Sequence, residues 1–152
     1  MHAYNYLLTE NTFIIQNQEI IPLHDYVHLQ KGVRNNLLTK DLLIKNKDCE
    51  EFASWNDIII AYEMDKYSFF KQRQLPKLTD KHVFPELIPK MKVKYATQVL
   101  SHTLANFIDV VMTLNQGIMN TTKCQMQLPQ SATGKIILFF DELFDSFNGQ
   151  KE

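Results

Sequence analysis

The spacing of hydrophobic residues along the chain predicts a mainly helical protein with a small β part. Two β-prone runs come first, Thr12–Ile15 and Glu19–Leu23, and the polar residues between them are typical of a hairpin turn. A helix is expected from Tyr26 to Thr39, because apolar residues recur every four positions, at Leu29, Val33 and Leu37. The polar stretch from Thr39 to Glu51 is expected to be a frayed helix end followed by a linker.

A second helical unit is expected after this linker. Ser54, with Asp57 three residues later, is typical of a helix start with a capping box. A helix that continues toward Pro76 would direct five residues to the core, namely Trp55, Ile58, Ile59, Tyr62 and Phe69. Pro85 and Pro89 predict that the next stretch is short and irregular.

The strongest periodicity runs from Val93 to Leu114 and predicts one long central helix that ends at Gly117. Residues 117–129 are polar and are expected to form a loop. A last helix is expected from about Ser131 to Phe147, with Gly149 ending it.

Composition places the chain among globular proteins. With 152 residues and 45% hydrophobic content, it is long enough for one domain, or one domain and a fragment. Cys49 and Cys124 are far apart and in no metal-ligand spacing, so neither a disulfide framework nor a zinc site is indicated. No apolar run is long enough for a membrane span and no signal peptide is apparent, so we expect an intracellular protein.

The net charge of −1 conceals an uneven distribution of basic residues. From Lys66 to Lys94 there are eight basic residues and two acidic ones, a local net charge of +6. Such an excess is suited to binding phosphates, although a solvated helix face is an equally good interpretation.

Two strings of residues carry a resemblance to a known family. The first is DYVHLQKGVRNN at 25–36; the second combines LPKLTDKH at 75–82 with KMKVKYATQVLSHTLA at 90–105, and FDELFDSFN follows at 140–148. Together and in this order they resemble the P-element family of DNA transposases. The resemblance implies a partial RNase H-like α/β segment at residues 1–50, followed by an all-helical GTP-binding insertion at residues 51–152.

The resemblance implies a role for Asp25 in the first string. It would be the second carboxylate of an RNase H-like catalytic site, a ligand of the Mg²⁺ ions that cut DNA. An aspartate in this position also commonly caps the following helix, and spacing alone favours that role. Lys31, Arg34 and Asn35 would pack or contact phosphates, with structural salt-bridging an equal alternative.

The second string implies a nucleotide site without the usual phosphate loop. The chain has no G-x-x-x-x-G-K-S/T motif, and Gly134-Lys135 lacks the preceding glycine. By the resemblance, Lys77 and Lys92 would meet the phosphates of GTP, Val93 would line the pocket, and Asp145 would recognise the guanine base. The alternative is that both lysines and Asp145 are ordinary surface residues.

The resemblance also implies transposon-end DNA as a partner, homo-oligomer formation, nuclear localisation and no membrane association. The chain alone is expected to be unable to cleave DNA, because the family's first aspartate and last glutamate are not within it. Two further hypotheses remain: a non-catalytic helical module that binds protein or DNA without nucleotide, and an inert by-product of a decaying element. Saturable binding of GTP would distinguish the transposase hypothesis from the helical module, which binds no nucleotide.

Overall fold

The computed structural model describes residues 13–15, 18–20, 26–45 and 47–147. Its elements, in chain order, are β1 (Phe13–Ile15), β2 (Gln18–Ile20), α2 (Tyr26–Thr39), β3 (Leu42–Lys45), β4 (Glu50–Ala53), α3 (Trp55–Lys66), α4 (Asp80–Val83), α5 (Val93–Val99), α6 (His102–Asn115), β5 (Ile118–Asn120), β6 (Gln125–Gln127) and α7 (Thr133–Phe147). Each described strand belongs to a two-stranded antiparallel hairpin, β1 with β2, β3 with β4, and β5 with β6. The predicted fold class, mainly α with a small β part, is confirmed.

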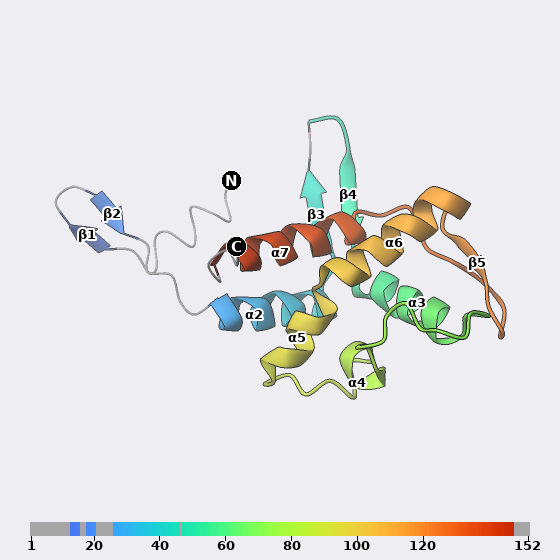
Figure 1. Cartoon of the computed structure of the whole chain (residues 1–152). Coiled ribbons are helices and arrows are strands. Elements are labelled where there is room, and N and C mark those ends of the chain that lie inside the picture. The colour runs from blue at the N-terminus through green and yellow to red at the C-terminus, as the bar shows by residue number, and fades with distance from the viewer. Residues whose placement is uncertain (1–12, 16–17, 21–25, 46, 148–152) are drawn as a thin grey trace.

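Helices from both ends of the described chain share one hydrophobic core. α6 packs along α7, and α2 packs against both α5 and α7 (Figure 1). The core includes Leu37 of α2, Ile58 of α3, Leu104 and Ile108 of α6, and Ile137 of α7. Burying an aliphatic side chain of this kind contributes about 1.5–3 kcal/mol. This shared burial holds α2 to the helices that follow it.

The predicted division into residues 1–50 and 51–152 stays a prediction. Position 50 lies at the first residue of β4, whose partner β3 precedes it. α2, which also precedes position 50, contributes Leu37 to the common core. Asp25 and Gly149 both lie outside the described residues.

The helix predicted over residues 26–39 is confirmed as α2. Of its expected apolar stripe, Leu37 is buried and Val33 is half-buried, whereas Leu29 is exposed. The predicted N-terminal hairpin is also present, with Phe13 of β1 opposite Ile20 of β2.

The helix that begins at Ser54 is shorter than predicted. The Ser54 side chain accepts a hydrogen bond from the backbone N–H of Asn56 at 3.3 Å, which confirms the predicted N-cap. The helix ends at Lys66 rather than near Pro76, because residues after Tyr67 turn back toward the carboxylate of Asp65. The prediction that Phe69 faces the core was therefore wrong, and its side chain is 70% exposed.

The long central helix predicted over residues 93–114 is two helices, α5 and α6. Ser101 is extended (φ −126°, ψ 153°), and its hydroxyl accepts the backbone N–H of Leu104 at 3.4 Å, which begins α6. Val99, Leu100 and Leu104 are all buried, so the apolar periodicity continues through the break. The prediction of a continuous helix was wrong for that reason.

Two segments predicted as a linker and a loop are β-hairpins. In the first, β3 pairs with β4 from Leu42 opposite Ala53 to Lys45 opposite Glu50. In the second, β5 pairs with β6 after α6 ends at Gln116, a left-handed residue with φ of 55°. These strands have only three or four residues each and most of those residues are exposed, so they are too short and too polar in surroundings for a periodicity to predict them. Within the residues described, no helix has the length and apolar character to cross a membrane.

Candidate functional site

The structure places the four predicted nucleotide-binding residues in three segments. Lys77 is exposed in the turn before α4, whereas exposed Lys92 and half-buried Val93 are the N-cap and first residue of α5. α4 packs against α5, so the segment of Lys77 and the segment of Lys92 and Val93 belong to neighbouring helices. Asp145 is exposed on α7, and in the described part of the chain no hydrogen bond or ion pair links it to the other three.

Asp65 binds the segment that leads into the turn carrying Lys77. The Asp65 carboxylate, on a side chain that is only 1% exposed, accepts the backbone N–H groups of Gln74 at 2.7 Å and Leu75 at 3.1 Å. It also forms an ion pair with Arg73. Leu75 and Leu78 are buried on either side of the turn. Lys77 is thereby presented to solvent on an ordered backbone.

α4 is attached to its neighbours by side-chain hydrogen bonds. The backbone N–H of Thr79 donates to Nδ1 of His82 at 3.1 Å, so Nε2 carries the ring hydrogen and donates to Gln98 at 2.6 Å. The indole N–H of Trp55 donates to the carbonyl of Val83 at 2.8 Å. These contacts connect α4 to α3 on one side and to α5 on the other.

A cluster of Tyr62, Lys66 and Asp80 joins α3 to the start of α4. Oδ1 of Asp80 accepts the hydroxyl of Tyr62 at 2.6 Å and Nζ of Lys66 at 2.9 Å. These two hydrogen bonds, that of Tyr62 first, lower the pKa of Asp80. Burial, followed by the bond to Asp80, raises the pKa of Tyr62 to about 12.

The pKa of Tyr62 predicts a loss of stability at high pH. A folded pKa of about 12 above an ordinary value of 10.0 means that its stabilisation is complete below pH 10 and is lost as the pH rises toward 12. We expect the difference in unfolding free energy between the natural protein and Tyr62→Phe to shrink by roughly 2–3 kcal/mol over this interval. Urea unfolding at several pH values measures it, and a difference that stays constant would contradict the assignment.

Most basic residues of the 66–94 segment have no acidic partner. Lys66 pairs with Asp80 and Arg73 with Asp65, whereas among the described residues the remaining six lysines form no ion pair. Five of these six lie around α4 and α5, and we call them the α4–α5 lysines: Lys77, Lys81, Lys90, Lys92 and Lys94. All five are exposed. Because no carboxylate must be displaced first, they are available to phosphate oxygens.

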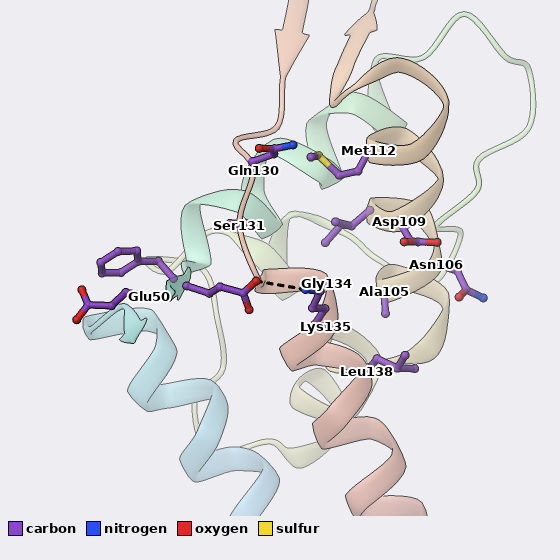
Figure 2. A pocket seen from close by; sticks show the side chains of 13 residues that line it. Glu50, Ala105, Asn106, Asp109, Met112, Gln130, Ser131, Gly134, Lys135 and Leu138 are labelled. Carbon is purple, nitrogen blue, oxygen red and sulfur yellow. Dashed lines mark hydrogen bonds and ion pairs between the residues drawn. The ribbon is translucent and has the colours of Figure 1, made fainter. Parts of the chain in front are cut away.

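A separate pocket of about 590 Å³ lies between β4, α6 and the start of α7 (Figure 2). Its charged lining consists of Glu50, Glu51, Asp109 and Lys135, and Lys135 is itself bound to Glu51 at 3.3 Å. None of the four predicted residues lines it. Its excess of carboxylates disfavours binding of a polyphosphate.

The polar contacts beside this pocket are structural. Ser131 lines the pocket and donates to Oδ2 of Asp57 at 2.7 Å, as does Thr133 at the same distance. Thr133 in turn accepts the backbone N–H of Ser54 at 3.0 Å. These bonds connect the start of α3 to the start of α7. The sequence showed Gly134-Lys135 only as a partial phosphate-loop motif, and nothing in its spacing indicated this pocket.

Comparison with known families identifies the type of domain. Residues 27–152 match the family described as TNP-like, GTP-binding insertion domain. The chain belongs to this family. The predicted relationship to the P-element transposases is thereby confirmed.

The insertion domain also shares its fold with a solved structure, the Drosophila P element transposase strand transfer complex. The TM-score is 0.61 at 22% sequence identity, over 95% of this chain. The chain spans 30% of the length of that transposase chain. No curated protein matched the sequence.

Among the described residues, no group of three or more His, Cys, Asp or Glu side chains is placed to hold a metal ion. The predicted Mg²⁺ ligand Asp25 lies outside those residues, and its role stays a prediction.

Proposed function

We propose that the chain is the GTP-binding part of a P-element-like transposase, and that the nucleotide supports binding of transposon-end DNA in the longer protein. The observation that carries this proposal is the set of exposed α4–α5 lysines, which form no ion pair with a described residue, within a chain of the GTP-binding insertion family. In this proposal the nucleotide is a structural ligand, as the resemblance to the P-element family implies.

In this proposal Lys77 and Lys92 bind the phosphates. Both are exposed and free of carboxylate partners in the described chain, so binding an anion costs no existing ion pair. Half-buried Val93, directly after Lys92, offers apolar surface to the ribose or base. The packing of α4 on α5 supports the joint action of the two lysines.

Asp145 is proposed to recognise guanine, since a carboxylate accepts both hydrogen bonds of the base's amide and amine edge. Asp145 contributes, after burial, to raising the pKa of Asp141, an effect that a charged carboxylate one helical turn away produces. Its position on α7 means that the nucleotide must reach from the α4–α5 lysines to this helix.

In the longer protein we further propose that Asp25 is one Mg²⁺ ligand of an RNase H-like catalytic site, to which residues 1–50 contribute a partial RNase H-like segment. Mg²⁺ would supply activation of the attacking water or hydroxyl in that site. Nuclear localisation and homo-oligomer formation belong to the same proposal. They follow from the resemblance to a DNA transposase.

Titration calorimetry with GTP at physiological magnesium tests the nucleotide site. We expect saturable binding, and a loss of affinity of about tenfold for Lys77→Gln and for Lys92→Gln, because a charge-assisted bond contributes about 1.5 kcal/mol. Lys47→Gln is the matched control: Lys47 is equally exposed but lies in the β3–β4 turn, and its loss should leave affinity within about twofold.

Two results would contradict the proposal. Absence of saturable binding would show that GTP is not the ligand. Equal losses of GTP affinity for Lys47→Gln and Lys92→Gln would show that the site is not at Lys92. The same lysines are also suited to the phosphates of duplex DNA, which supports the alternative of a helical binding module without nucleotide. Salt-dependent binding of a duplex, without GTP binding, would favour that module.

A further inference from the structure

Arg34, in the middle of α2, is buried without an acidic partner. Its side chain is 0% exposed, and in the described part of the chain no carboxylate forms an ion pair with it. Nε donates to Oδ1 of the adjacent Asn35 at 3.0 Å, and Nη2 donates to the carbonyl of Lys90 at 2.7 Å. Nη1 is buried and has no hydrogen-bond partner among the residues that the structure describes.

This arrangement is costly to the fold. A buried guanidinium without a counter-ion, and with an unsatisfied N–H group, is less favourable than an aliphatic side chain of similar volume. The neighbouring contact between α2 and α5 is also polar, since Thr97 donates to buried Gln30 at 3.1 Å. Stability alone therefore does not account for an arginine at position 34.

The carbonyl group that accepts the hydrogen bond from Arg34 belongs to Lys90, two residues before Lys92. Lys90 belongs to the turn that precedes α5, in which the backbone N–H of Lys92 donates to the carbonyl of Pro89 at 3.0 Å. The Arg34 side chain reaches this turn across 56 positions of sequence. The Arg34 hydrogen bond thus connects α2 directly to the turn before α5, in addition to the packing of α2 on α5 and the Thr97–Gln30 bond.

We propose that Arg34 is the positioning residue of the nucleotide site, because its bond to the Lys90 carbonyl sets the place of Lys92 against the phosphates. This inference rests on the proposed GTP-binding function. Arg34 itself touches no ligand, since its side chain is buried. The sequence-based interpretation left packing, phosphate contact and a salt bridge open for Arg34, and the role proposed here is an indirect one for a packed side chain.

A double-mutant cycle in GTP titrations tests the inference. We expect Arg34→Met to lower the affinity about tenfold in the natural protein, but less than about twofold in a Lys92→Gln background, because the lysine that it positions is then absent. In a Lys77→Gln background the tenfold loss should persist. Arg34→Lys, which keeps a charged donor, should recover part of the affinity.

Gln30→Met is the matched control. It removes the neighbouring buried α2–α5 hydrogen bond without touching the turn at residues 89–92. It should lower the melting temperature and leave GTP affinity within about twofold. A loss for Arg34→Met that is the same with and without Lys92, or that Gln30→Met reproduces, would reduce Arg34 to a structural residue and overturn the inference.

The outcomes separate the two proposals. If the natural protein does not bind GTP, the proposed function fails and the inference fails with it. If the natural protein binds GTP but the cycle is additive, only the inference fails. If the circular dichroism melt shows that Arg34→Met does not fold, the cycle is measured with Arg34→Lys. Its smaller loss of GTP affinity should likewise disappear in the Lys92→Gln background, and a loss that is the same in both backgrounds would overturn the inference.

Discussion

Replacing Asp65 by alanine is expected to lower the free energy of unfolding by about 3–5 kcal/mol. The substitution leaves Arg73 without its carboxylate and the backbone N–H groups of Gln74 and Leu75 without acceptors. Leu75 is buried, so water cannot readily replace that bond. Urea unfolding measures the loss, and weaker GTP binding should accompany it because the same segment carries Lys77.

Two companion variants make this result specific. Asp48→Ala removes an exposed carboxylate from the β3–β4 turn and should change stability by less than about 0.5 kcal/mol. Asp65→Asn keeps one oxygen acceptor and should lie between the alanine variant and the natural protein. A loss below about 1 kcal/mol for Asp65→Ala would show that its carboxylate does not anchor the segment.

The helices were predictable wherever one apolar face repeats along a single element. The expected helix at residues 26–39 coincides with α2, and the last expected helix, from about Ser131 to Phe147, corresponds to α7. Ser54 was identifiable as an N-cap because capping depends on local residue chemistry. Each of these features is determined by residues within a few positions of one another.

The failures occurred where local patterns carry no information. Val99, Leu100 and Leu104 maintain one periodicity across two helices, and only the hydroxyl of Ser101 marks the break. The strands of the β3–β4 and β5–β6 hairpins have three or four residues each and are mostly exposed, so they resemble loops.

In the candidate site, too, contacts between distant segments could not be predicted from local patterns. Motif resemblance predicted a nucleotide-binding role for the adjacent pair Lys92 and Val93, which stays a prediction, and the excess of lysines around them was visible in the charge pattern. The contact between Arg34 and Lys90 was not predictable, because it depends on how α2 packs against the start of α5. In the same way, the role of Asp65 follows from a chain reversal after α3 that no periodicity indicates.

Gly117 is the clearest case in which a locally predicted helix stop has a tertiary cause, and its replacement by alanine should be severely destabilising. Gly117 has φ of +85°, and an added Cβ would lie 2.5 Å from the carbonyl oxygen of Leu128. The backbone there is fixed, since the Leu128 N–H donates to the Gly117 carbonyl at 2.8 Å and the Leu128 side chain is buried. The left-handed conformation and the clash together should cost about 2–5 kcal/mol.

The same substitution at Gly32 should have the opposite sign. Gly32 lies within α2, and no atom of the described residues lies within 4 Å of an added Cβ, so alanine gains helix propensity and should stabilise the protein by about 0.5–1 kcal/mol. Urea unfolding of Gly117→Ala and Gly32→Ala side by side compares an identical chemical change in two backbone environments. If Gly117→Ala were as stable as the natural protein, α6 and the β5–β6 hairpin could not be joined by the left-handed turn that the structure shows. If Gly32→Ala were destabilised instead, the open surroundings of Gly32 on α2 would be wrong.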